Sequence, residues 1–234
     1  MPTHPIVTRA EWLVQRKELL AAEKAFTQAR EALAVRRRAL PWVRVDKPYT
    51  FDGAAGDVPF AALFGDRTQL VVYHLMFGPD EKVACPLCSF WADNFDRSVV
   101  HLAHRDVAMV AISRAPLPKL QAYRDRMRWT FPWYSSGKTS FNQDFHVTIP
   151  AAEDELGPDN YNYASGGRAG EAPGISVFVK DDSGAIFHTY SCFARGLDMM
   201  NATYQYLDLV PKGRDEGALP FTMNWVRRWD EYGG

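Results

Sequence analysis

The sequence predicts an α/β fold in which a mixed sheet is flanked by helices. Three observations carry this prediction. An apolar run at 70–77 is followed by bulky residues at helical spacing from 86 to about 104, a second apolar run lies at 106–113, and a hairpin pattern occupies 175–190. Strands that alternate with helices are expected to pair in parallel through right-handed crossovers, whereas a hairpin adds antiparallel strands.

The chain begins with a long helix, predicted from Arg9 to Leu40. Glu, Ala, Leu, Arg and Lys dominate it, Thr8 and Glu11 have the spacing of a capping box, and Pro41 ends it. Large apolar residues recur every seven positions and form a single seam: Trp12, Leu19, Phe26, Leu33 and Leu40. This seam predicts either packing along the helix's own domain or docking on a partner subunit, and the second alternative implies a homodimer.

Short elements are expected between this helix and the first apolar run, and again after the second run. Extended segments at 42–45 and 49–52, with Gly53 and Gly56 after them, suggest a short hairpin, and 59–65 suggests a turn of helix. A further helix is predicted from about Leu117 to Met127, and a short extended piece at 130–134.

The last third of the chain changes in composition. Gly, Asn, Asp, Pro and Tyr dominate 150–174, which predicts a long surface loop. The hairpin strands at 175–180 and 185–190 follow, then a helix at about 197–206 and a tail with Trp225 and Trp229. These features predict three parts, which are a helical arm at 1–48, an α/β domain at 49–210, and a tail at 211–234 packed on that domain.

Two cysteines mark the junction between the first strand and its helix, in the sequence Cys85-Pro86-Leu87-Cys88. The first turn of a helix has free N–H groups and a partial positive charge, which stabilise a thiolate. Pro86 suits the first helical position, because no N–H partner is lost there. Cys85 is expected to face solvent and act as the nucleophile, and Cys88 to lie under it as the resolving thiol. The motif therefore predicts dithiol–disulfide chemistry.

A zinc site is the rival interpretation, because His101 and His104 complete a C-x2-C-x12-H-x2-H pattern. The gap between the histidines is one residue shorter than is usual for such sites. If 88–104 is one helix, a rise of roughly 1.5 Å per residue places the histidines about two dozen Å from Cys85. The prediction is therefore that the protein holds no metal and needs no cofactor, with plain packing of the cysteines as a third alternative.

Composition limits the remaining classes. The formal charge of −1 on 234 residues gives no sign of binding to nucleic acid or to an acidic membrane. Three cysteines are too few for a disulfide scaffold, and no apolar stretch approaches the roughly 20 residues of a membrane span. The first residues lack the features of a signal peptide. A cytoplasmic location is expected, where thiols are kept reduced.

The predicted order of elements is that of thioredoxins. More specifically, the chain resembles a bacterial family of thioredoxin-like proteins described as predicted dithiol–disulfide oxidoreductases and otherwise labelled as of unknown function. The resemblance runs nearly from end to end and rests on rare strings, which are RRALPW at 37–42, YHLMFGP at 73–79, CPLCSFWAD at 85–93, WTFPW at 129–133, ARGLD at 194–198 and WVRR at 225–228. It implies a thioredoxin-like fold and an oxidoreductase that uses the C-x-x-C dithiol.

The chain also departs from the relatives of that fold. Ile175 aligns with the position where thioredoxins carry a cis-proline opposite the active site, and Pro173 lies two residues upstream. This difference puts the docking of protein disulfides in doubt. The P-x-x-x-T-x-x-C string of peroxiredoxins is absent, which argues against an ordinary peroxiredoxin.

Trp91, Trp133 and Arg195 are the candidate substrate-binding residues. The tryptophans can line a groove beside the thiols and Arg195 can bind an acidic group, while the alternatives are core packing and a structural salt bridge. His74 is predicted to be a satisfied core histidine, and Cys192 a buried apolar residue.

The predicted reaction needs a disulfide or peroxide substrate and an external thiol reductant as partners. The Cys85 thiolate attacks a substrate disulfide, and Cys88 then attacks the mixed disulfide and releases the reduced substrate. A thiol peroxidase that works through a sulfenic acid is the second enzymatic hypothesis. The third hypothesis is a non-catalytic redox-sensing or interaction protein.

Overall fold

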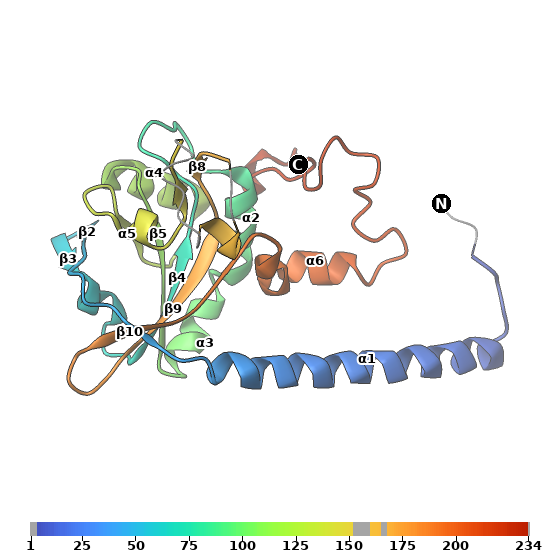
Figure 1. Ribbon diagram of the computed structural model, residues 1–234. Helices are drawn as coiled ribbons and strands as arrows, with labels where there is room; N and C mark the ends of the chain where they lie inside the picture. Colours follow the sequence, from blue (N-terminus) through green and yellow to red (C-terminus); the bar gives the residue numbers. More distant parts are fainter. Residues whose placement is uncertain (1–3, 152–159, 165–167, 234) are drawn as a thin grey trace. The chain divides into compact units, whose positions relative to one another are not determined.

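A mixed sheet lies at the centre of the part of the chain that follows Pro41 (Figure 1). The structure is a computed structural model, which describes residues 4–151, 160–164 and 168–233. The eight strands of the sheet run in the order β1-β10-β9-β4-β5-β6-β2-β3. Their bounds are β1 Val43–Arg44, β2 Thr50–Gly53, β3 Gly56–Pro59, β4 Gln69–His74, β5 Val107–Ser113, β6 Trp133–Ser135, β9 Gly174–Lys180 and β10 Ile186–Phe193. A second ladder joins β7 (Thr148–Ile149) to β8 (Gly170–Glu171).

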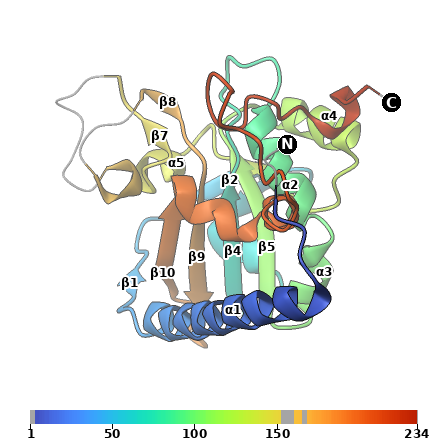
Figure 2. The same ribbon diagram turned by 90° about the vertical axis from the view of Figure 1, so that its right-hand side faces the viewer.

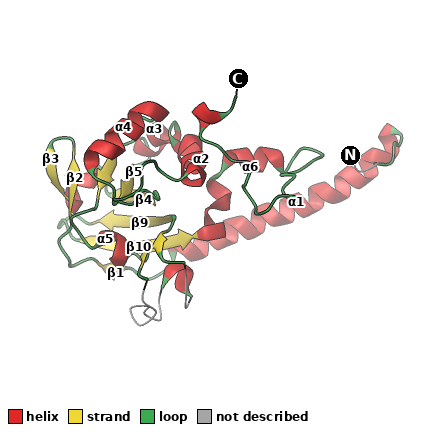
Figure 3. Cartoon of the chain, turned by 90° about the horizontal axis from the view of Figure 1, so that it is seen from above, coloured by secondary structure: helices red, strands yellow, loops and turns green. Residues whose placement is uncertain are grey.

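Helices cover both faces of this sheet. The described α-helices of the chain are α1 Arg9–Arg38, α2 Pro86–Phe95, α3 Ser98–Ala103, α4 Leu117–Met127, α5 Phe141–Asp144 and α6 Ala202–Leu207. The described 3-10 segments are η1 Phe60–Phe64, η3 Tyr161–Tyr163, η4 Ala194–Met200 and η5 Trp229–Glu231. In Figure 3, α2, α3 and α4 lie along one side of the strands and α5 lies on the other.

The strand pairing confirms the predicted thioredoxin-like fold. β4 pairs in parallel with β5, and β9 pairs antiparallel with β4 and with β10. Figure 2 shows β10, β9, β4 and β5 side by side in this order. A parallel strand–helix–strand unit joined edge-on to an antiparallel hairpin is the connectivity that the sequence predicted.

Alternate residues of β4 point into two separate apolar cores. Tyr73 belongs to the core under α2 and α4, together with Leu75, Phe77 and Phe95, whereas Leu70 and Val72 belong to the core under η1 and α5. This period of two is expected of a strand that is buried on both faces. The thiol motif lies at the first of these cores.

The chain divides into two compact units, Met1–Pro41 and Trp42–Gly234. The first unit is α1, which begins with the predicted capping box, because Thr8 accepts from the Glu11 N–H and Glu11 accepts from the Thr8 N–H. None of its described residues is buried, and the seam residues Trp12 and Phe26 are 44% and 70% exposed. The unit that begins at Trp42 includes β1, and it also includes the tail after Pro211.

The sequence predicted a single helix from 86 to about 104. This is wrong, because the segment forms two helices. α2 ends at Phe95 and α3 begins at Ser98. The break coincides with Asp96, whose carboxylate accepts hydrogen bonds from the backbone of Thr130 and Phe131 at 2.7 and 3.2 Å. A contact more than thirty residues away in sequence therefore interrupts the period that the local pattern predicts.

Other differences also arise from contacts that are distant in sequence. The short hairpin predicted for this region forms at Gly53 and Gly56, where β2 pairs with β3, but the segment at 42–45 is not part of it, because β1 pairs with β10. The last predicted helix is a 3-10 segment, η4, followed by α6. The loop expected at 150–174 contains η3 and β8, and its residues 152–159 and 165–167 lie outside the described residues.

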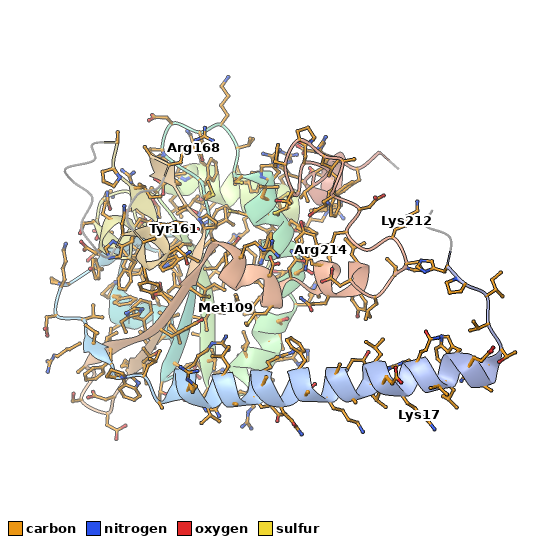
Figure 4. All side chains as sticks on the ribbon, turned by 45° about the vertical axis from the view of Figure 1, so that its right-hand side comes forward. Lys17, Met109, Tyr161, Arg168, Lys212 and Arg214 are labelled. Atoms are coloured by element: carbon orange, nitrogen blue, oxygen red, sulfur yellow. The ribbon has the colours of Figure 1, made fainter. Side chains whose placement is uncertain are left out.

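The tail after Pro211 is held on its unit by aromatic packing. Val226 is buried, and the Trp225 ring lies 5.6 Å from that of Phe90 in α2. Upstream lies Arg214, which Figure 4 labels. Its guanidinium lies 3.9 Å above the Tyr204 ring of α6 and pairs with Asp208. None of the described helices is long and apolar enough to span a membrane.

Candidate active site

The thiol motif lies where the chain leaves β4 and enters α2. The Cys85 N–H donates to the Met76 carbonyl at 3.1 Å, which ties the motif to the end of the strand. Cys85 is the residue before the helix and Pro86 is the first helical residue, as predicted. Since Pro lacks an N–H, the free donors at this helix end are those of Leu87 and Cys88.

The two thiols are free and differ in exposure and acidity. Cys88 is 2% exposed, whereas Cys85 is half-buried. A hydrogen bond from the Cys88 side chain lowers the pKa of Cys85 to about 6, and the N–H groups of Cys88 and Leu87 add to this effect against burial and the charge of Glu81. The same hydrogen bond and burial raise the pKa of Cys88 well above its usual value. Near neutral pH, Cys85 is therefore a thiolate and Cys88 a thiol.

Tyr73 of β4 is a site residue that the sequence did not single out. Its hydroxyl donates to the Cys88 carbonyl at 3.1 Å, and a hydrogen bond from Tyr73 also favours the Cys88 thiolate. Burial, followed by the charge of Cys88, raises the pKa of Tyr73 well above its usual value, so it stays protonated. The alternation of side chains along the strand could have identified Tyr73 from the sequence, because residues 73, 75 and 77 share the face of the sheet that α2 covers.

The tail contributes a second residue that the sequence did not single out, Arg228. Its guanidinium donates to the Ala84 carbonyl at 2.6 Å and to the Tyr123 hydroxyl at 2.7 Å. Tyr123 shares a hydrogen bond of 2.8 Å with Ser89, and the Ser89 hydroxyl donates to the Cys85 carbonyl at 3.0 Å. Arg228 therefore fixes the backbone on both sides of Cys85.

A cavity of about 340 Å³ opens beside the two thiols. Its walls come from β4, α2, η4 and the tail, and its lining residues include Tyr73, Met76, Cys85, Leu87, Cys88, Trp91, Pro173, Leu197 and Met223. A volume of this size is at the lower end of the range for small-molecule sites. Because both cysteines line it, a group bound there lies next to the thiols.

The structure brings two of the three candidate binding residues to this cavity. Trp91 and Arg195 line it, and the Trp91 indole N–H donates to the Leu197 carbonyl at 2.8 Å. Arg195 is paired with Asp198 at 2.8 Å. Trp133 is not among the lining residues. It is 4% exposed, and its indole N–H donates to Ser113.

Besides Pro86 within the motif, Pro173 lies near the thiols. It lies one residue before β9 and lines the cavity, whereas Ile175 pairs with Tyr73 across the sheet.

The remaining candidate ligands and the third cysteine lie elsewhere. His101 and His104 are exposed, and no three His, Cys, Asp or Glu side chains in the described ranges gather as a metal site. Cys192 is half-buried rather than buried, and it pairs with Ile175 along β10. The expected burial of Cys192 is incomplete because β10 has only β1, two residues long, on its outer side.

Comparison with solved structures finds peroxiredoxins. A peroxidoxin, BcpB from Mycobacterium tuberculosis, has 15% identity and a TM-score of 0.48, over 71% of this chain and 97% of that one. A cysteine-to-serine mutant of peroxiredoxin Q from Xanthomonas campestris has 14% identity and a TM-score of 0.45, over 73% and 98%. A cysteine-to-serine mutant of PrxQ from Xylella fastidiosa has 11% identity and a TM-score of 0.43, over 69% of this chain and 89% of that one.

A search of curated proteins found no match. A family model matches residues 1–232, which is nearly the whole chain, and its description is bacterial protein of unknown function (DUF899). The chain belongs to this family.

Proposed function

We propose that the protein is a thiol–disulfide oxidoreductase in which Cys85 attacks and Cys88 resolves. The observation that carries the proposal is the opposite shift of the two thiol pKa values at a helix start that opens on a cavity. The thiolate is the reactive form in exchange, and a thiol whose pKa lies near the ambient pH attacks best.

The reaction has two steps. The Cys85 thiolate attacks one sulfur of a substrate disulfide, so that a mixed disulfide forms and the other half of the substrate leaves as a thiolate. Cys88 then loses its proton and attacks Cys85, which forms the Cys85–Cys88 disulfide and releases the second half as a thiolate. An external thiol reductant returns both cysteines to the reduced state.

Tyr73 and Arg228 serve this reaction without touching the substrate disulfide. The hydrogen bond from Tyr73 favours the Cys88 thiolate, which has to form in the second step. Arg228 holds the Ala84 carbonyl and, through Tyr123, the turn that carries Cys85. Both are positioning residues.

Reduction of a peroxide is the second candidate, because the half-buried thiolate at Cys85 can also attack a peroxide oxygen. Cys85 would become a sulfenic acid as the alcohol or water leaves, and Cys88 would then displace water to form the same disulfide. Both reactions end in the same oxidised protein, so only the substrate distinguishes them.

Turnover measurements separate these functions. The reduced protein is mixed with a small disulfide or with hydrogen peroxide, and dithiothreitol is supplied as reductant. Turnover with the disulfide supports the first proposal, and turnover with peroxide alone supports the second. Stoichiometric oxidation without turnover supports a redox sensor.

The homodimer remains a proposal about the first unit. It is supported by the seam on α1, where Phe26 is 70% exposed and Leu19 is 56% exposed. Sedimentation of the full chain at tens of micromolar checks it, and a monomer at that concentration contradicts it.

A further inference from the structure

The cavity beside the thiols presents almost only carbon and sulfur atoms to a ligand. Its apolar walls are Met76, Leu87, Leu197 and Met223, together with Pro173. Met side chains are polarizable and adapt to apolar groups of different shapes. An apolar group that leaves water for this space is therefore stabilised, whereas a polar group loses its hydrogen bonds to water.

Polar groups on the walls already have partners within the chain, and the Arg195 side chain is 81% exposed to solvent. The Trp91 indole N–H donates to the Leu197 carbonyl, and the Tyr73 hydroxyl donates to the Cys88 carbonyl. The charged pair at the site is Arg195 with Asp198, and Asp198 also accepts from Arg214 at 3.1 Å. A hydroxyl or amide that enters the cavity has to compete with these internal partners.

We infer that the substrates of this site are small, uncharged disulfides that carry an apolar group on the sulfur attacked by Cys85. The apolar group lies in the cavity while the disulfide meets the thiolate at its edge. The inference rests on the proposed thiol–disulfide exchange and names its substrate class.

Two disulfides of equal size test it, dipropyl disulfide and bis(2-hydroxyethyl) disulfide. Each arm of the first ends in a methyl group where the second has a hydroxyl. The Cys88→Ser protein is used, so that the mixed disulfide at Cys85 accumulates and its rate of formation is read by mass spectrometry. Each rate is divided by the rate at which dithiothreitol reduces the same disulfide, which removes the difference in intrinsic reactivity.

We expect the normalised rate to be at least about tenfold higher for dipropyl disulfide, since burial of its terminal methyl group is favourable and the unpaired hydroxyl of the other compound adds a penalty. Equal normalised rates, or a faster reaction with the hydroxyl compound, overturn the inference. If neither disulfide forms a mixed disulfide, the proposed exchange itself fails, which is a different outcome.

Two substitutions test the cavity wall: one lies in the wall, and the other lies outside it and serves as the matched control. Leu87→Gln, made in the Cys88→Ser protein, places an amide in the cavity and should reduce the preference for dipropyl disulfide at least threefold. Leu207→Gln should leave the preference unchanged, because Leu207 packs on the same core without lining the cavity. Alkylation of Cys85 by iodoacetamide at a similar rate in both variants shows that the thiolate is intact, and an unchanged preference in Leu87→Gln contradicts the inference.

Discussion

Each face of β4 carries a buried polar side chain, and the two side chains differ in their surroundings and in the direction of their pKa shift. Tyr73 lies against Cys88 on the face that α2 covers, and His74 lies on the other face, 5.8 Å from the Phe141 ring. Each is 1% exposed. Burial raises the pKa of Tyr73 well above its usual value and lowers that of His74 to about 3, so both side chains are neutral near pH 7.

The second face carries a chain of neutral hydrogen bonds. His74 Nε2 lies 2.9 Å from the Ser176 hydroxyl, which lies 2.8 Å from that of Ser191, and His188 Nε2 lies 2.7 Å from Ser191. The first face differs because donors at Cys88 and Leu87 stabilise a negative charge on Cys85. Donors to the charged form, and not burial alone, therefore decide whether a buried group beside this sheet is charged near neutral pH.

Removal of either thiol is the strongest test of that difference. Cys85→Ser should abolish exchange, because the attacking sulfur is gone. Cys88→Ser should react once and stop as a mixed disulfide that a reducing agent releases. Mass spectrometry of the protein after exposure to a small disulfide reads both results.

Cys192→Ser is the control for these variants and should keep turnover, since Cys192 does not line the cavity at the thiols. Trapping by Cys85→Ser in place of Cys88→Ser would reverse the roles of the two cysteines. One zinc per purified chain, lost when His101 or His104 is changed, would replace the redox assignment altogether.

The pH dependence of Cys85 is the next largest effect. Cys88→Ala removes the side-chain donor that most lowers the Cys85 pKa, so that this pKa should rise from about 6 toward its ordinary value. The thiolate fraction at pH 6 should then fall by about tenfold or more. Iodoacetamide alkylation of the Cys85 peptide between pH 5 and pH 9 measures the midpoint.

Cys88→Ser is the matched variant, because its hydroxyl keeps a donor at the same place, and its midpoint should lie below that of Cys88→Ala. The thiolate is the reactive form and the Cys85 pKa is about 6, so wild-type reactivity should fall as the pH drops through about 6 and stay level above about 8. A common midpoint for all three proteins would show that the backbone donors act alone.

Arg228 tests whether the tail supports the reactive face. Arg228→Gln removes the donor to the Ala84 carbonyl, and small displacements of reacting groups can cost up to about 100-fold in rate. We expect the plateau rate of mixed-disulfide formation to fall about tenfold, with rescue in part by Arg228→Lys. Arg227→Gln is the control, because Arg227 is exposed and its guanidinium donates to the Asn224 and Val226 carbonyls of its own turn. Equal plateau rates of mixed-disulfide formation in Arg228→Gln and Arg227→Gln would show that Arg228 does not support the reaction at Cys85.

The parts that the sequence predicted well are specified locally. The start of α2 at Pro86, the bounds of α4 at Leu117 and Met127, and the capping box at Thr8 follow from caps, breakers and period. Cys85 and Cys88 were found for the same reason, since the motif and the helix start are adjacent in the chain.

The parts that the sequence missed depend on contacts between distant residues. The carboxylate of Asp96 breaks the helix through a bond to Thr130, and Arg228 reaches Ala84 across 144 positions. Trp133 is a core residue for a similar reason, because its indole meets Ser113 inside the sheet. Nothing in a single sequence states these pairings, so the cavity wall from the tail could not be assembled in advance, whereas Arg195 of η4 had been named as a candidate.

The smallest expected effect concerns the second face of β4. His74 has a folded pKa of about 3, below the roughly 6.5 of an unfolded histidine, so the unfolded chain binds more protons between these values. The free energy of unfolding should therefore fall as the pH is lowered through this window, by about 1.4 kcal/mol per pH unit from His74 once well below pH 6.5. His188, whose pKa burial also lowers, acts in the same direction.

Urea unfolding at pH 6.5, 5.5 and 4.5 should show a shallower slope of this free energy against pH for His74→Gln than for the wild type. His101→Gln, at an exposed position, should keep the wild-type slope. Because slopes are compared, the loss of the hydrogen bond to Ser176 does not enter. Parallel curves for all three proteins would mean that His74 accepts a proton within the folded protein.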